Sequence, residues 1–305
     1  MTALVKDALK PNLVQTLEGT PAFIHGGPFA NIAHGCNSVL ATKLALSHAD
    51  YVVTEGGFGG DLGAEKFLDI KCRSANIEPD AVVVVATIRA LKMHGGLALV
   101  NLKQEDLEAL TLGFRNLQKH VENMQDVFGM NTIVAVNSFS ADTEEEKKLL
   151  IELCKEQGYR AVLADVWGKG GTGGEELAHA LVEMTAIPSK LKHPYELTDS
   201  IETKITSIVQ KVYGGVGLEW STKAKRAMRR MEKLGLDHLP ICMAKTQYSL
   251  SDNPKLLGRP EGFTVSVSDM TVSAGAGFIV VLTGDVMKMP GLPKVPSANH
   301  MDVDA

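Results

Sequence analysis

Long apolar runs and paired cysteines are both missing from this sequence. Its 305 residues include only four cysteines, which are widely spaced and form no CxxC pair (Cys36, Cys72, Cys154 and Cys242). That spacing favours reduced thiols over disulfides or a zinc site. No apolar run reaches the length of a membrane span, and the N-terminus lacks a secretory pattern. We therefore expect a cytoplasmic protein with no membrane partner.

An excess of positive charge is missing as well. The chain has 31 Lys and Arg against 36 Asp and Glu, a net charge of −5, which argues against nonspecific nucleic-acid binding. The densest basic cluster, at residues 223–230, is typical of a solvated helix face, and a polyanionic ligand tail is the alternative. With 45% hydrophobic and 22% charged residues, the chain can build a substantial core and more than one domain.

Glycine is abundant in one short stretch. Five glycines lie within residues 56–63, where an ordinary helix or strand would lose stability. Residues 51–54 before them indicate a short buried strand, and residues 64–73 after them indicate a helix. A strand, a bare backbone loop and a helix in this order place amide N–H groups beside a ligand at the strand end. A tight structural turn is the alternative.

Two carboxylates flank this glycine-rich loop. Glu55 follows the expected strand and Asp61 lies within the glycines. Carboxylate oxygens are preferred Mg²⁺ ligands, so Glu55 and Asp61 are candidate metal-binding and catalytic residues. We include Gly56, Gly57 and Phe58 of the loop among the candidate cofactor-binding residues.

A run of valines at residues 81–86 predicts a strand buried on both faces. Polar and cationic side chains follow it at Thr87, Arg89, Lys92 and His94. Ligands of parallel α/β sheets gather at the carboxyl ends of strands, so Arg89 is a candidate catalytic residue that contacts an anionic substrate. Ordinary ion pairs at a helix start are the alternative.

The middle of the chain predicts a parallel sheet. A long helix over residues 104–128 precedes a βαβ unit with strands at 133–137 and 161–166 and a helix at 143–157. Thr143 and Glu146 form a capping-box pattern at the start of that helix. We therefore predict the α/β class, with mainly parallel sheets and helices on both faces.

An aromatic residue follows each strand of this βαβ unit. Phe139 comes after the first and Trp167 after the second, and parallel strands end at the same edge of a sheet. Two aromatics that converge there can hold a flat heterocycle between them. The alternative is that each is a core side chain.

The glycine-rich segment 168–176 superficially resembles a phosphate-binding loop. Its Lys169 precedes the glycines and no Ser or Thr follows that lysine, unlike a P-loop. Glu175 and Glu176 open the next helix and would repel phosphate. We therefore reject a nucleotide P-loop here. For His25 and His34 we favour structural roles, with a phosphate or formyl contact as the alternative.

The last third predicts two helices and three strands. The helices cover residues 201–213 and 221–234, and the strands cover 241–244, 263–267 and 277–282. Region boundaries are expected near residues 96–103 and 190–200.

The sequence resembles the formate–tetrahydrofolate ligase family along nearly its whole length. The glycine-rich segment 55–67, Glu-Gly-Gly-Phe-Gly-Gly-Asp-Leu-Gly-Ala-Glu-Lys-Phe, matches a central motif of that family. Five further segments match in the same order, at residues 23–36, 85–96, 245–251, 273–278 and 289–294. The family usually has basic residues near 267–270, where this chain carries Ser268 and Asp269.

The resemblance implies ATP-dependent formation of 10-formyltetrahydrofolate from formate and tetrahydrofolate, through formyl phosphate. It implies Mg²⁺, an optional monovalent cation and a homo-oligomer, the family being tetrameric. By the matching motifs, Phe139 and Trp167 hold the pterin, and Leu163 lies near the adenine.

The family's Gly-Lys-Ser/Thr loop does not occur in these 305 residues. The chain therefore resembles the C-terminal half or more, with an incomplete P-loop NTPase-like first region at 1–100. A folate-binding βαβ region at 101–195 and an α/β region at 196–305 are expected to follow. An N-terminal half would then be a partner, and the alternative function is a non-catalytic folate- or adenine-binding module.

Overall fold

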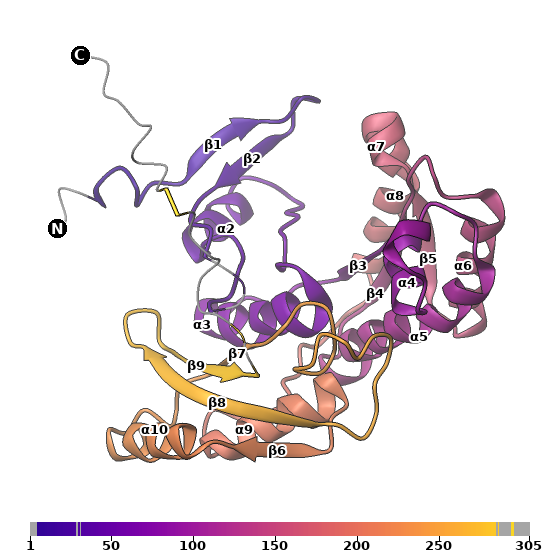
Figure 1. The fold of residues 1–305 in the computed structure, drawn as a ribbon. Helices are drawn as coiled ribbons and strands as arrows, with labels where there is room; N and C mark the ends of the chain where they lie inside the picture. Colours follow the sequence, from indigo (N-terminus) through magenta and orange to yellow (C-terminus); the bar gives the residue numbers. More distant parts are fainter. Residues whose placement is uncertain (1–4, 29, 31, 285, 287–293, 296–305) are drawn as a thin grey trace.

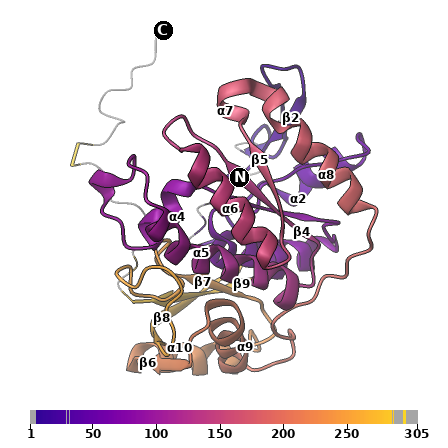
Figure 2. The same cartoon turned by 90° about the vertical axis from the view of Figure 1, so that its right-hand side faces the viewer.

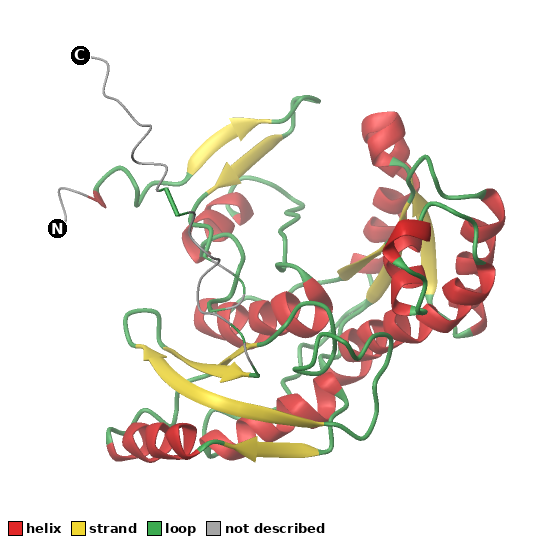
Figure 3. Cartoon of the chain, in the orientation of Figure 1, coloured by secondary structure: helices red, strands yellow, loops and turns green. Residues whose placement is uncertain are grey.

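The computed structural model describes residues 5–295 apart from 29, 31, 285 and 287–293. The chain has an α/β fold built on three sheets (Figure 1). A two-stranded hairpin and a three-stranded parallel sheet stand as two arms above a four-stranded sheet (Figure 1). Figure 3 shows helices beside the three-stranded sheet and the four-stranded sheet.

The parallel sheet has the order β3-β4-β5. Its strands are β3 (Val82–Ala86), β4 (Thr132–Asn137) and β5 (Arg160–Ala164). In the central strand, Val134 and Val136 pack on one face with α5 (Leu107–Glu122) and α6 (Glu144–Glu156), while Ile133 packs on the other with α8 (Glu175–Thr185). Since a strand directs alternate side chains to opposite faces, this burial requires helices on both sides. The α/β class and the βαβ unit are confirmed.

The capping box at the start of α6 is also confirmed. The Thr143 hydroxyl accepts from the Glu146 N–H, and the Glu146 carboxylate accepts from the Thr143 N–H. Glu146 is fully buried and its other oxygen accepts from Lys92 Nζ at 2.6 Å. This ion pair joins α6 to α4 (Ile88–His94), so Lys92 has the structural role considered above.

The four-stranded sheet is mixed and has the order β6-β8-β9-β7. Its strands are β6 (Gly217–Trp220), β7 (Ile241–Ala244), β8 (Thr264–Ser273) and β9 (Phe278–Thr283). One face packs on α9 (Ile201–Ser207), its continuation η6 (Ile208–Tyr213) and α10 (Thr222–Lys233). Figure 2 shows this layer beneath the parallel sheet.

One helix connects the sheets, and it begins inside the glycine-rich stretch. It runs through two wide π-type segments, η1 (Gly59–Ala64) and η2 (Phe67–Cys72), into α3 (Arg73–Ala75). Ile70 packs on the other face of the four-stranded sheet, while Phe67 and Leu68 belong to the core on the α9 side. The helix predicted at 64–73 is confirmed, and it starts five residues earlier than predicted.

The remaining elements are short. They are listed here in chain order: β1 (Asn12–Gln15), β2 (Pro21–Ile24), α2 (Val39–Leu46), η3 (Leu99–Asn101), η4 (Asn123–Val127), α7 (Val166–Lys169) and η5 (Gly170–Gly174). Strands β1 and β2 pair as an antiparallel hairpin.

Two predictions about strands are wrong. Residues 51–54 form no strand, and Tyr51 and Val53 are 62% and 90% exposed. A strand needs a paired neighbour, and no described segment lies in register with these residues. The valine strand β3 is not buried on both faces, because Val85 is 62% exposed. Among the described strands β3 pairs only with β4, so it is an edge strand. The boundary predicted at 96–103 falls between these two paired strands.

Candidate functional site

The glycine-rich loop packs tightly onto its own helix. Gly57 has a φ of +76°, and a Cβ on Gly63 would meet the backbone of Gly56 and Gly57. The Gly63 N–H donates to the Phe58 carbonyl at 3.0 Å. Part of the glycine content is therefore required by a close turn, as the structural alternative proposed.

Asp61 is buried in this turn and forms an ion pair. Its Oδ2 lies 2.6 Å from Nζ of the fully buried Lys245, and its Oδ1 lies 3.9 Å from Nδ1 of His120. Burial by itself raises the pKa of Asp61, but the charges of Lys245 and His120 hold the pKa below its ordinary value. Burial lowers the pKa of His120, and the charge of Asp61 opposes this shift.

The ion pair of Lys245 and Asp61 joins the segment 245–251 to the glycine-rich loop, and the two residues are 184 positions apart in the sequence. Lys245 follows β7, and its Nζ donates to the carbonyls of Thr246 and Ser249. The same Nζ lies 5.1 Å from the ring centre of Tyr213. The segment 245–251 thus wraps around one buried ammonium group whose counter-ion is in the glycine-rich loop.

The remaining polar candidates form no part of that ion pair. Glu55 and Phe58 are exposed. Arg89 is exposed in the first turn of α4 and forms no ion pair within the described residues. His94 accepts from the Gly258 N–H at 3.1 Å, which is a structural contact. Within the described part of the chain, no three His, Cys, Asp or Glu side chains converge as a metal site.

A second buried cluster on this helix was missed from the sequence. Glu65 is fully buried, and neither carboxylate oxygen has a hydrogen-bond partner among the described residues. Burial, with the charge of Asp69 next, raises the pKa of Glu65 well above its ordinary value, so the carboxyl keeps its proton to higher pH than an ordinary glutamate does. Asp69 accepts from His193 at 2.8 Å and from Arg73 at 3.3 Å. The only sequence signal was the density of charge between the apolar positions of an otherwise core-facing helix.

The strand-end aromatics lie at a common edge of the parallel sheet. Asn137 and Ala164 are register partners, and the Ser138 N–H donates to the Ala164 carbonyl at 2.9 Å. Phe139 comes two residues after β4 and is 40% exposed, while Trp167 lies in α7 and is 77% exposed. Neither is a core side chain, so the alternative of two core aromatics is wrong. Leu163 lies in β5 and is 37% exposed.

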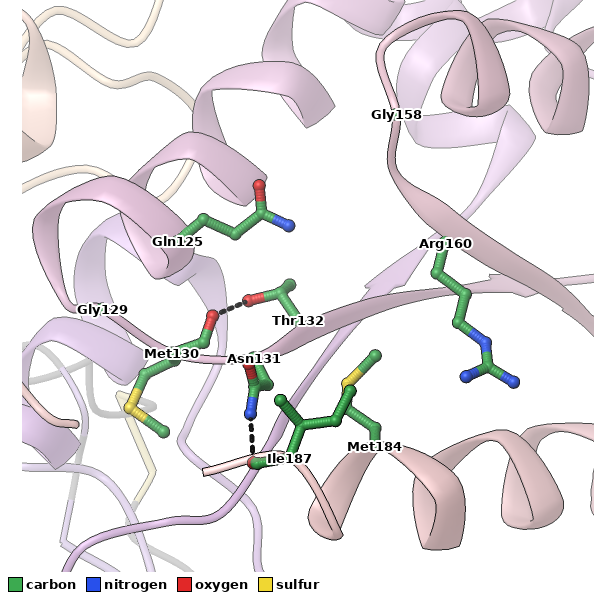
Figure 4. Close-up of a pocket in the computed structure, with 9 residues that line it drawn as sticks. All are labelled: Gln125, Gly129, Met130, Asn131, Thr132, Gly158, Arg160, Met184 and Ile187. Carbon is green, nitrogen blue, oxygen red and sulfur yellow. Dashed lines mark hydrogen bonds between the residues drawn. The ribbon is translucent and has the colours of Figure 1, made fainter. Parts of the chain in front are cut away.

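A cavity of about 390 Å³ lies at the opposite edge of this sheet (Figure 4). It is lined by residues of η4, of the starts of β4 and β5, of the end of α8 and of the loops beside them: Gln125, Gly129, Met130, Asn131, Thr132, Gly158, Arg160, Met184 and Ile187. Arg160 is held by Glu183 at 2.6 Å. Because ligands of parallel sheets bind at the carboxyl ends, we assign this cavity no part in the candidate site.

Three sequence features have other outcomes. His25 bonds Ser38 and the Ala8 carbonyl, which confirms a structural role, while His34 packs edge-on against Phe278. Asp269, at a position usually basic in the family, pairs with Lys223 at 3.0 Å. The motif at 289–294 lies outside the described residues except for its last position.

Fold and site together define an α/β protein with an exposed aromatic edge and a glycine-rich loop anchored by a buried ion pair. The family model for formate–tetrahydrofolate ligase matches residues 1–305. The chain belongs to this family, whose chemistry is ligation of formate and tetrahydrofolate. No helix in the described part of the chain has the length and apolar composition to cross a membrane.

Proposed function

We propose that this chain supplies the folate and adenine side of a formate–tetrahydrofolate ligase site. The reaction is ATP-dependent formation of 10-formyltetrahydrofolate through formyl phosphate. The carrying observation is the pair of exposed aromatics, Phe139 and Trp167, at paired strand ends of a family member.

The pterin is the ligand that suits this edge. A flat heterocycle between the two rings gains stacking energy beyond simple burial. Phe139 is fixed at its backbone, since its N–H donates to Asp142 at 2.8 Å. Leu163, one strand position before the end of β5, offers an apolar contact for the adenine.

The glycine-rich loop is proposed as the phosphate side. Formate resists nucleophilic attack until phosphorylation activates its carboxylate, and phosphoryl transfer depends on positioning and charge neutralisation. The amides of Gly56 and Gly57, with Phe58 next to them in the sequence, can contact anionic groups. We propose the exposed Arg89 as a further contact for an anionic substrate.

Magnesium would neutralise phosphate charge at this loop. Glu55 is the accessible carboxylate, whereas Asp61 is already bound to Lys245. We propose Glu55 as the carboxylate nearest a bound Mg²⁺ and Asp61 as the residue that anchors the loop. Direct Mg²⁺ ligation by both carboxylates stays a prediction.

The phosphate-cradling lysine is proposed to come from polypeptide outside these residues, because no Gly-Lys-Ser/Thr occurs within them. The division into regions 1–100, 101–195 and 196–305, a homotetramer, monovalent-cation dependence and a cytoplasmic location belong to the same proposal. The second candidate, a non-catalytic folate- or adenine-binding module, is favoured by the same missing loop.

The test is product formation by the purified chain with formate, ATP and tetrahydrofolate. We expect tetrahydrofolate binding by the chain alone, and 10-formyltetrahydrofolate only when a polypeptide carrying the Gly-Lys-Ser/Thr loop is added. Binding without turnover in either mixture would support the non-catalytic module. Absence of folate binding would contradict both candidates.

A further inference from the structure

A carboxylate from one arm of the molecule is bound by bare backbone in the other. Glu18 lies at the tip of the β1–β2 hairpin, and its Oε1 accepts from the Gly171 N–H at 2.6 Å. Gly171 belongs to η5, which follows directly on α7. Figures 1 and 2 both show the hairpin tip reaching towards α7.

The backbone at this point leaves room for a carboxylate. A Cβ built on Gly171 would collide with the Glu18 carboxylate, which supplies its three nearest atoms, and one on Gly170 would lie 2.8 Å from Oε1. Gly170 needs glycine for its φ of +61°, but Gly171 has no positive φ. Its missing side chain therefore serves the approach of the carboxylate.

This carboxylate position adjoins the proposed pterin edge. Trp167 lies four residues before Gly171. Lys169, between them, is 67% exposed at its side chain and lies 3.7 Å from Asp165. Glu175 and Glu176 in the first turn of α8 disfavour a phosphate dianion, which leaves a singly charged carboxylate as the suitable anion.

We propose that the Gly170–Gly171 backbone, which lies beside Trp167 and here receives the Glu18 carboxylate, binds a carboxylate of the glutamate tail of tetrahydrofolate. Glu18 and Gly171 are both exposed, so a ligand carboxylate can displace the hairpin contact. Glu18 then acts as an internal competitor. This inference rests on the proposed folate function and adds a determinant of specificity for the tail.

The experiment compares two probes that differ only in the tail, tetrahydrofolate and tetrahydropteroate. Each is titrated into the whole chain while Trp167 fluorescence is followed, in a Trp220→Phe background. We expect tetrahydrofolate to bind more tightly than tetrahydropteroate. Gly171→Ala should reduce this ratio of affinities roughly tenfold, as expected for the loss of one charge-assisted hydrogen bond. Glu18→Gln should widen the preference by roughly threefold, because the competing charge is gone.

Gly174→Ala is the matched control. It changes the same loop, but its Cβ would make only an ordinary contact of 3.5 Å with Val166. The preference for tetrahydrofolate should survive this change. If both probes bind and the preference for tetrahydrofolate over tetrahydropteroate is the same in Gly171→Ala as in the parent, the carboxylate site is overturned. The folate function is then left standing. Failure of both probes to bind the parent would overturn both.

Discussion

Two regions of the molecule differ in the exposure of their candidate functional residues. One is the helix of η1, η2 and α3, which begins in the glycine-rich stretch, and the other is the edge of the parallel sheet that carries the two aromatics. On the helix, Asp61, Glu65 and Asp69 are buried and held by other charged groups or by a retained proton. At the sheet edge, Phe139 and Trp167 are apolar and yet exposed.

This difference distinguishes residues that the fold needs from residues that are free to bind a ligand. A buried charge persists only where partners compensate its loss of hydration, so the helix charges are explained by the fold. Phe139 and Trp167 are exposed and so are free to contact a ligand, as the proposed folate site requires. Changes on the helix should therefore alter stability first, and changes at the edge should alter binding first.

The largest expected effect is loss of the buried ion pair. Lys245→Met leaves the Asp61 carboxylate buried without its partner and should lower the free energy of unfolding by about 3–5 kcal/mol. Urea unfolding measures this. Arg115→Met is the matched control, because it breaks an exposed pair with Glu261 and should cost at most about 1 kcal/mol.

The double variant Asp61→Leu, Lys245→Met sharpens the interpretation. Removing both charges should recover much of the stability that Lys245→Met loses. A single variant as stable as the parent would show that this pair does not anchor the loop.

A smaller effect concerns pH. The unfolded chain releases the Glu65 proton near pH 4.5, whereas the folded chain keeps it to higher pH because burial and Asp69 raise the pKa. The stability that Glu65 contributes is therefore complete below pH 4.5 and is lost as pH rises through the folded pKa.

Glu65→Gln removes this titration. The unfolding free energy of the variant should fall less than that of the parent between pH 4.5 and pH 8, as measured by urea midpoints at several pH values. Because Glu65 and Asp69 titrate as a coupled pair, the difference between the two profiles reports the contribution of Glu65 together with its effect on Asp69. Parallel profiles would mean that Glu65 is ionised in the folded chain.

The smallest expected effect is on stability at the sheet edge. Trp167→Ala should change the free energy of unfolding by no more than about 0.5 kcal/mol, since the side chain is 77% exposed. The same urea measurement checks this. A loss above about 2 kcal/mol would give Trp167 a packing role and weaken the contrast between the two regions.

Local patterns predicted much of the fold. The period of apolar residues and the capping pair at Thr143 and Glu146 predicted the βαβ unit, because these signals act within one element. The prediction of a strand at 51–54 was wrong, and strand β6 was not predicted. Both results depend on whether a distant segment supplies a pairing partner, which a local pattern does not contain.

The site was predictable to a different extent in each region. The common edge of Phe139 and Trp167 follows from parallel topology alone. The partner of Asp61 does not follow from topology, because Lys245 is brought there by packing of the four-stranded sheet against the helix of η1, η2 and α3. Burial of Glu65 depends on the same packing, and so does the retention of its proton.

Binding of tetrahydrofolate to variants of the aromatic pair tests the proposed folate site most directly. In a Trp220→Phe background, titration followed by Trp167 fluorescence should show quenching, and Trp167→Phe should keep much of the affinity when binding is measured calorimetrically. Trp167→Ala and Phe139→Ala should each weaken binding roughly tenfold, since each stacked face contributes about 1 kcal/mol beyond burial. Equal affinity in the parent and both alanine variants, with the fold intact, would contradict a pterin site at this edge.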